Sequence, residues 1–413
     1  MNTIAIIILL TIVLDLLLHL ISDALNLKML RNEVPKPFKG IFDAERYAKS
    51  QDYLKVNTRF GWISTIVNTL IMLVFWFGGG FALLDAWARS LGLGPVITGL
   101  IYIGVLMLAY GIFAQPFSLY ATFVIEERFG FNKTTLKTYV ADLGKGFVLA
   151  IILGTPLLAG ILAFFQYAGA GAWLLCWAAV TLYMLFIQFI APTWIMPLFN
   201  KFSPLEEGKL RERIFAYAQS IHYPLANVFV MDGSKRSGKS NAFFTGFGKN
   251  KRIVLFDTLI EQHTTEELLA VLAHEMGHYK KRHILKGMLI AVVQTGAMFF
   301  LLSFFISYQG LFDAFYLEQP SVYAGLIFFG MLYAPLDFFL GILSQMRSRK
   351  YEFQADRFSV ETTRNPIAMV DALKKLAVHN LSNLVPHPFY VFLNYSHPPV
   401  LKRVEAIESI QLG

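Results

Sequence analysis

Seven long apolar stretches set the first constraint on what this chain of 413 residues can fold into. A helix needs about 20 consecutive apolar residues to cross the hydrocarbon core of a bilayer. The first stretch has no basic segment before it and no small-residue cleavage site after it, so we expect a membrane helix rather than a cleaved signal peptide. The chain is therefore predicted to be an all-α polytopic membrane protein. The stretches lie near residues 3–22, 62–84, 97–124, 146–168, 172–195, 284–308 and 321–345.

The share of charged residues supports this interpretation. Only 15% of the residues are charged and 55% are hydrophobic, whereas a soluble protein carries about 25% charged residues. In a soluble chain a net charge of +8 would suggest nucleic-acid binding, but in a membrane protein it indicates basic cytoplasmic loops. No nucleic-acid partner is therefore expected. The single cysteine, Cys176, lies in an apolar stretch and excludes a disulfide framework.

The distribution of Lys and Arg predicts the orientation in the lipid bilayer. Residues 23–60 carry eight such residues and loop 125–145 carries four, whereas loops 169–171 and 309–320 carry none. Basic loops stay on the cytoplasmic side of a membrane. The alternation places the N-terminus outside and the C-terminus in the cytoplasm, in a bacterial inner membrane or an endoplasmic reticulum membrane.

Polar side chains interrupt several of the apolar stretches. Because a polar group is costly in lipid, these side chains should face the protein interior or water. Asp15 and His19 lie four residues apart and can pair, although each can equally serve to hold neighbouring helices together. Taken together, the polar positions favour a water-filled interior: Asp15, His19, Asn68, Gln115, Gln188, Gln294 and Asp337.

An H-E-x-x-H motif follows a helix start signal in the largest polar segment. Thr264 and Glu267 form a capping box at the start of the predicted helix. Residues four apart lie on one helix face. His274 and His278 can therefore bind one Zn²⁺, with Glu275 beside the metal as general base.

A catalytic zinc site needs three protein ligands, so another element has to supply the third. The long metzincin form of the motif is excluded, because Lys281 and Ile284 stand where it requires glycine and histidine. On a continued helix, His283 would point about 140° away from His278. Glu352 follows the last apolar stretch on the same membrane side and is the expected third ligand. Asp356 shares its helix face and can accept the outer N–H of a ligating histidine, although the two carboxylates also fit a solvated acidic face.

A second motif in the same polar segment imitates a phosphate-binding loop. Residues 233–240 fit the pattern G-x-x-x-x-G-K-[ST], which is confirmed only if a helix follows directly. The run 241–247 is instead typical of a strand, in a hairpin with residues 252–256 through a turn at 248–250. We therefore expect a basic Gly/Ser loop and no nucleotide partner. A helix over 205–221 and a strand over 227–231 are predicted before it.

The C-terminal segment supplies one further candidate. His397 precedes two prolines that open a last helix, which we expect to run through Ile410. A histidine in this place can stabilise an oxyanion or hold a substrate carbonyl. A lone histidine before prolines is also a common helix cap.

These elements predict four parts along the chain. Membrane helices occupy residues 1–195, with their cytoplasmic loops, and residues 284–345. Residues 196–283 form a cytoplasmic insertion that carries the H-E-x-x-H helix. Residues 346–413 complete a mainly helical zinc-protease domain, which contains a small β-hairpin or sheet.

Several segments together resemble the type I CAAX prenyl proteases, integral-membrane zinc metalloproteases of the gluzincin kind. The resemblance covers nearly the whole chain. It implies seven helices around a large water-filled chamber, with one zinc ion at the cytoplasmic end of that chamber. It also implies a substrate with a prenylated C-terminal Cys-a-a-X sequence, which loses its last three residues. The matching segments are 124–142, 192–210, 240–259, 272–283, 347–358 and 394–407.

The resemblance also implies roles for individual residues. His274, His278 and Glu352 correspond to the zinc ligands and Glu275 to the catalytic base. Asp356 corresponds to a second carboxylate that is sometimes assigned as a proton donor. The residues that correspond to substrate contacts are His397, Arg403, Asn241 and Ala242.

The sequence therefore predicts a zinc endopeptidase that cleaves near the C-terminus of prenylated substrates. One alternative is a membrane-protein quality-control protease without lipid preference. Another class of protein, a transporter or channel, also binds metal through histidines. Transporters often carry internal repeats with broken helices at the midplane, and the sequence contains no visible repeat of this kind.

Overall fold

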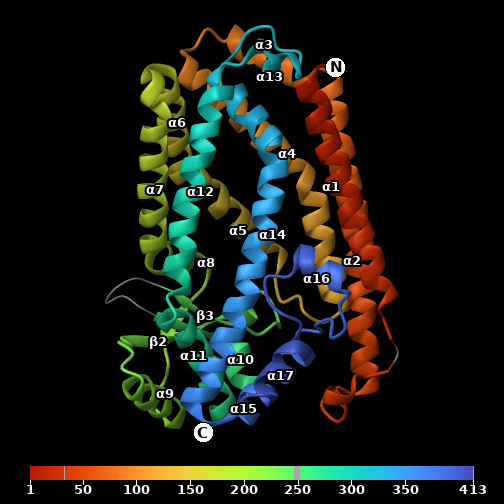
Figure 1. Ribbon diagram of the computed structural model, residues 1–413, viewed down its shortest axis with the longest axis vertical. Helices are drawn as coiled ribbons and strands as arrows, with labels where there is room; N and C mark the ends of the chain where they lie inside the picture. The colour runs from red at the N-terminus through yellow and green to blue at the C-terminus, as the bar shows by residue number, and fades with distance from the viewer. Residues whose placement is uncertain (32, 246–251, 413) are drawn as a thin grey trace.

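The long helices determine the shape of the molecule. The computed structural model describes residues 1–31, 33–245 and 252–412. Within these residues, seven helices are long and apolar enough to cross a membrane, which confirms the predicted number. They run along the long axis, and the remaining elements gather at its two ends (Figure 1). The spans are Thr3–Lys28, Ala44–Phe77, Pro95–Glu126, Leu136–Tyr167, Gly169–Phe199, His283–Phe305 and Val322–Thr363.

Three consecutive spans contain a π-helical segment, in which each turn holds extra residues. One of these segments, η5, contains Pro192, whose ring removes a backbone donor from the helix. The three spans are built as follows: α4 (Pro95–Tyr120) and η2 (Ala121–Glu126); α5 (Leu136–Leu149), η3 (Ala150–Gly154) and α6 (Thr155–Tyr167); η4 (Gly169–Gly171), α7 (Ala172–Ile190), η5 (Ala191–Ile195) and α8 (Met196–Phe199). The other four spans are α1 (Thr3–Lys28), α2 (Ala44–Phe77), α12 (His283–Phe305) and α14 (Val322–Thr363).

The end of the molecule far from the sheet is closed by aromatic packing under two short helices, α3 (Gly80–Ser90) and α13 (Gln309–Asp313). Trp76 is fully buried there and donates its indole N–H to the carbonyl oxygen of Ala314 at 2.8 Å. Phe315 stacks on Phe328 with ring centroids 3.8 Å apart. In contrast, only 6–22% of the residues in the most apolar windows of the spans are buried within the protein, so most of their surface faces lipid or an open interior.

The opposite end carries a sheet with strand order β1-β2-β4-β3, so β3 is an edge strand. The strands are β1 (Phe202–Pro204), β2 (Asn227–Met231), β3 (Ala242–Thr245) and β4 (Arg252–Phe256). β2 and β4 pair in parallel, and β3 pairs with β4 in antiparallel orientation. The predicted hairpin is thus confirmed, while its turn and residues 246–247 lie outside the described residues.

Three short helices, within residues 209–220, 257–262 and 265–280, form one apolar core with the sheet. The helix predicted from residue 205 begins only at Lys209. The N–H of Leu205 bonds the carbonyl oxygen of Val228, so the chain is still attached to the sheet there. The helices at this end are η1 (Lys36–Phe38), α9 (Lys209–Ser220), η6 (Gly233–Lys235), α10 (Asp257–Gln262), α11 (Thr265–Lys280), α15 (Pro366–His379), α16 (Pro388–Asn394) and α17 (Val400–Glu408).

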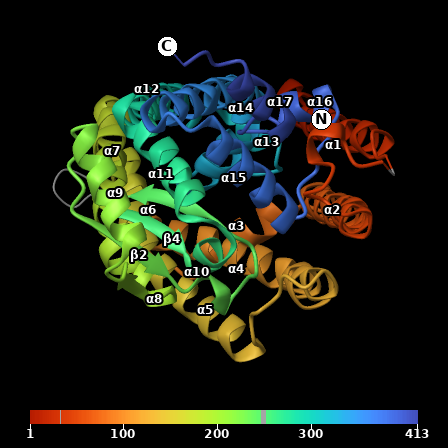
Figure 2. The same cartoon turned by 90° about the horizontal axis from the view of Figure 1, so that it is seen from below.

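Viewed from below, α10, α11 and α15 lie inside the outline drawn by the long helices (Figure 2). The span α14 is much longer than its apolar stretch and continues to Thr363 beside α11. A membrane helix therefore runs directly into the part of the molecule that carries the H-E-x-x-H motif.

Candidate active site

The helix α11 is fixed at its N-terminus before it presents any functional group. The Thr264 hydroxyl accepts the N–H of Glu267, and the Glu267 carboxylate accepts the N–H of Thr264 at 2.9 Å. This is the predicted capping box, and it satisfies two otherwise unpaired donors. Lys375 on α15 lies 2.7 Å from the same carboxylate. The start of α11 is thereby joined to α15.

The motif's own glycine allows α14 to approach α11 closely. A Cβ atom built on Gly277 would lie 3.1 Å from Phe358 and 3.3 Å from the Cα atom of Ala355, both on α14. These distances are tighter than ordinary van der Waals contact, so a larger residue would push the helices apart. Gly277 therefore helps to bring the α14 carboxylates within reach of the α11 histidines.

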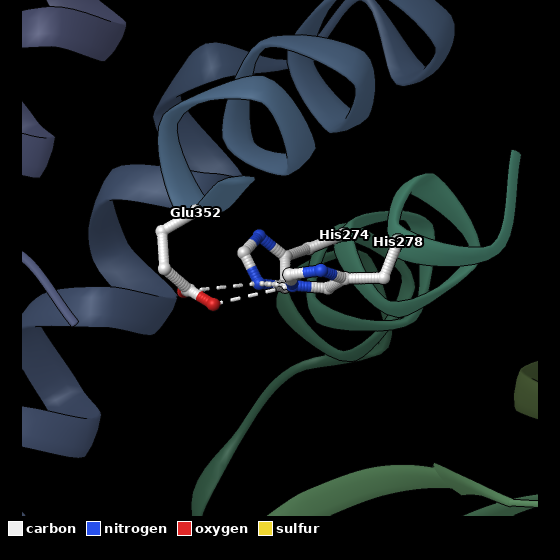
Figure 3. A group of neighbouring side chains, drawn as sticks. All are labelled: His274, His278 and Glu352. Atoms are coloured by element: carbon white, nitrogen blue, oxygen red, sulfur yellow. Dashed lines mark hydrogen bonds and ion pairs between the residues drawn. The ribbon is translucent and has the colours of Figure 1, made fainter. Parts of the chain in front are cut away.

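Two imidazoles and one carboxylate converge between these helices (Figure 3). The Nε2 atoms of His274 and His278 lie 3.1 Å apart. The two oxygens of Glu352 lie 3.4 Å from His274 Nε2 and 3.3 Å from His278 Nε2. Ligand atoms about 2.0–2.1 Å from one tetrahedral zinc ion are separated by about 3.3 Å. The cluster therefore has the spacing of a metal site.

A carboxylate oxygen that lacks a hydrogen bond supports the assignment of a metal site. Glu352 Oε2 is buried and has no hydrogen-bond partner among the described residues. Among the described residues its ion-pair contacts are long, 3.4 Å to His274 Nε2 and 3.4 Å to Arg403 Nη1, so this buried oxygen can still accept a closer positive partner. A divalent cation such as zinc fits this set of donors.

A second layer of contacts orients His274. Its Nδ1 atom lies 2.8 Å from Asp356 Oδ1. Arg403 on α17 holds the same carboxylate through two bonds, Nε to Oδ2 at 2.8 Å and Nη2 to Oδ1 at 2.6 Å. Burial disfavours the protonated ring of His274, but the Asp356 and Glu352 carboxylates outweigh it and raise its pKa to about 9. The site thus attracts a positive charge.

His278 is oriented by a contact that the sequence did not indicate. Its Nδ1 atom lies 3.0 Å from Nδ1 of His283, whose Nε2 lies 2.9 Å from the Gln354 side-chain oxygen. His283 also stacks on Tyr351. The prediction that His283 points away assumed a continuous helix. The chain turns at Arg282, whose φ is 58°, and this turn brings His283 behind its neighbour.

The remaining candidates line one small cavity of about 170 Å³ beside the cluster. Glu275 faces this cavity, and its removal from water raises the pKa of its carboxyl group. Apolar side chains form part of the wall. The lining includes Asn241, Ala242, His397 and Arg403 with the apolar residues Leu259, Val271, Met369, Leu373 and Leu376.

Two of these candidates differ in exposure. His397 is exposed and its Nε2 lies 3.4 Å from Glu352 Oε1. Arg403 is only 8% exposed and its Nη1 lies 3.4 Å from Glu352 Oε2. Asp356 does not belong to the residues that line this cavity and lies behind His274 instead. Its position favours orienting the histidine over donating a proton to a substrate.

The phosphate-loop imitation lies nearby and is followed by β3, as predicted, rather than by a helix. Two of its basic residues pair with membrane-helix residues near the sheet end of the molecule. Arg236 binds Asp142 through two hydrogen bonds, of 2.7 and 2.9 Å. Lys239 lies 3.1 Å from Glu126. The loop joins the sheet to the membrane helices.

Comparison with known proteins gives two family matches that together span most of the chain. Residues 23–201 match the family described as "CAAX prenyl protease N-terminal, five membrane helices". Residues 204–411 match "Peptidase family M48". The motif helix, Glu352 and Asp356 lie in the second match.

Similar proteins include "CAAX prenyl protease 1 homolog" of Oryza sativa, which is 36% identical over 385 residues, 91% of this chain and 90% of the relative. The homologue of Homo sapiens is 34% identical over 92% of this chain and 89% of its own. The crystal structure of S. mikatae Ste24p matches with a TM-score of 0.92 at 30% identity, over 99% of this chain and 100% of that chain. These findings favour a peptidase over the transporter considered as an alternative.

Proposed function

The chain belongs to peptidase family M48 and is a multi-pass membrane metalloprotease, and on this premise we propose that it removes C-terminal residues from prenylated Cys-a-a-X proteins. One zinc ion per chain would be held by His274, His278 and Glu352. The observation that carries this assignment is the convergence of three ligand atoms within 4.8 Å of one another. The relatives' printed names support the substrate class.

The chain's own groups divide the work of hydrolysis between them. When bound, zinc polarises the scissile carbonyl and activates a water molecule. Glu275 faces the cavity, accepts the proton of that water and passes it to the leaving nitrogen. His397 and Arg403 donate hydrogen bonds to the carbonyl oxygen as negative charge develops on it.

The edge strand β3 provides the place where the peptide lies. Asn241 and Ala242 line the cavity next to Glu275. An extended substrate can add to a free strand edge through backbone hydrogen bonds, which makes binding tolerant of side chains. Preference for the prenyl group would then come from the open interior between the membrane helices.

The proposed function also requires an orientation in the membrane and a separation of the chain into membrane and protease parts. We propose that the N-terminus lies outside and that the sheet end faces the cytoplasm, in an endoplasmic reticulum or bacterial inner membrane. Residues 196–283 and 346–413 would form the protease part and residues 1–195 and 284–345 the membrane part. Accessibility of terminal tags to protease in sealed vesicles tests the orientation.

The proposed activity is tested with matched peptides that differ only in prenylation. The purified protein should cleave a farnesylated peptide ending in Cys-a-a-X and release three residues, as measured by mass spectrometry. Chelation should abolish the reaction and added Zn²⁺ should restore it, with about one zinc per chain by metal analysis. Equal cleavage of the unprenylated peptide would favour a quality-control protease instead.

A further inference from the structure

The free edge of β3 exposes backbone groups only at alternate residues. Successive residues of a strand direct their N–H and C=O groups to opposite sides. The carbonyl oxygen of Asn241 accepts the N–H of Phe256, so the backbone groups of Asn241 face β4. The groups of Ser240 and Ala242 therefore face away from the sheet, toward the side where a substrate strand would lie.

At Ser240 this outer side is already occupied. The Asn380 side-chain oxygen accepts the N–H of Ser240 at 3.0 Å, and its amide nitrogen donates to the carbonyl oxygen of Ser240 at 3.1 Å. One side chain thus makes both bonds that a neighbouring strand would make at that position. Ala242 differs, because among the described residues its N–H bonds only the side-chain oxygen of Asn241, at 2.8 Å, which a substrate can displace.

Asn380 is held in place from both directions along the chain. It ends α15, and its N–H bonds the carbonyl oxygen of Leu376, which lines the active-site cavity. The next residue, Leu381, has a φ of 50° and is buried among Ile125, Phe129 and Phe131. The amide that closes the edge is therefore fixed between the cavity wall and the loops of the membrane helices.

We propose that Asn380 is a specificity-determining residue that closes the substrate edge at Ser240 and limits how many residues can follow the scissile bond. This inference rests on the proposed function. A strand advances about 3.3 Å per residue, so a peptide paired with Ala242 meets Asn380 about two residues later. A closed end can receive only the short C-terminal side of a substrate, whereas the long N-terminal side has to leave in the other direction. The substrate then runs antiparallel to β3, which is the more stable pairing.

The test compares peptides with identical sequence up to the scissile bond and with three or six residues after it. For the wild-type protein, kcat/KM should fall by about tenfold or more on lengthening, the effect of about one lost binding contact. In Asn380→Ala this length penalty should shrink to about twofold or less. Asn380→Asp keeps the acceptor for the Ser240 N–H but loses the donor, so its penalty should lie between the two.

Asn383→Ala is the matched control, because Asn383 lies in the same loop and its hydrogen bonds go to Asn26 and to the Val385 N–H, neither of which belongs to β3. It should keep both the activity and the full length penalty. A wild-type protein that cleaves both lengths equally overturns the role of Asn380 while leaving the proposed function intact, and this outcome does not depend on any variant folding. The role of Asn380 is likewise overturned if Asn380→Ala keeps the wild-type loss of kcat/KM on lengthening. If Asn380→Ala does not fold, the same result in Asn380→Asp overturns it. A wild-type protein that cleaves no peptide of either length overturns the proposed function and the limit with it.

Discussion

Two pairs of ionisable side chains with the same spacing have very different surroundings. Asp15 and His19 on α1 lie 3.4 Å apart, and their side chains are 51% and 45% exposed. Glu352 and Asp356 on α14 also lie four residues apart, but their side chains are 5% and 2% exposed. The side chains of the first pair contact mainly each other, whereas those of the second pair contact residues of α11 and α17. Spacing on one helix creates a pair, and only a second helix makes it a site.

The comparison predicts its largest effect at Glu352. Glu352→Ala removes one of three converging ligands, so metal affinity should fall by more than about 100-fold, beyond the 10–100-fold typical of changes behind a ligand. Activity should fall below detection. Asp356→Ala is the control on the same helix face and should keep most of the metal with roughly tenfold slower turnover. Metal analysis after dialysis decides, and full metal content in Glu352→Ala would show that the ligand is another residue.

A somewhat smaller effect is expected at Glu275, which lies next to the cluster without belonging to it. Glu275→Gln removes only the proton acceptor, so kcat should fall by about 10²–10⁴-fold while metal content and thermal stability stay near wild type. Single-turnover kinetics on the purified variant measure this. Near-normal kcat would exclude Glu275 as the base.

The edge strand should respond less strongly than the base. The Ala242 N–H faces away from β4, so Ala242→Pro leaves the β3–β4 pairing intact and removes a substrate contact. With the added clash of the ring, kcat/KM should fall by about 100-fold. Ala242→Gly keeps the N–H and should stay close to wild type. A metal-loaded Ala242→Pro protein with the wild-type rate would mean that β3 only covers the domain.

The smallest effect belongs to the exposed pair on α1. Because polar side chains within a span should face water rather than lipid, Asp15→Asn should change stability by less than about 0.5 kcal/mol, as for other water-exposed ion pairs, and activity by less than about twofold. Thermal unfolding in detergent and the peptide assay measure both. A large loss of activity with unchanged stability would instead place Asp15 on the substrate's path and would end the contrast between the two pairs.

The sequence predicted those features whose cause is local. Apolar length predicts the spans, and the capping box of Thr264 and Glu267 predicts the start of α11. Glu352 was found because a recognisable motif lacked one ligand, which turned a distant carboxylate into a specific expectation. The first strand, Phe202–Pro204, was not predicted, because three residues that include proline carry no strand pattern.

Contacts between segments that are distant in the sequence could not be predicted from local patterns. Asn380 bonds a residue 140 positions away and resembles any other asparagine at the end of a helix. His283 was directed away by a helical calculation that the left-handed conformation of Arg282 invalidates. No pattern of residue types predicts that the Asn380 side chain makes strand-like hydrogen bonds to Ser240, or that a helix ends at Arg282. Such features depend on the assembled fold.

The helix α14 connects the membrane-spanning part of the molecule directly to the proposed metal ligand Glu352. It holds 42 residues, about 63 Å, against a hydrocarbon core of about 30 Å. Pro335 lies inside it, about 26 Å of helix before Glu352. A metal ligand tolerates displacements of about 0.2 Å. If α14 bends at Pro335, a bend of about half a degree moves Glu352 by that distance. Bilayer thickness changes helix tilt by more than this, and the fit of α14 against Gly277 has to resist that leverage.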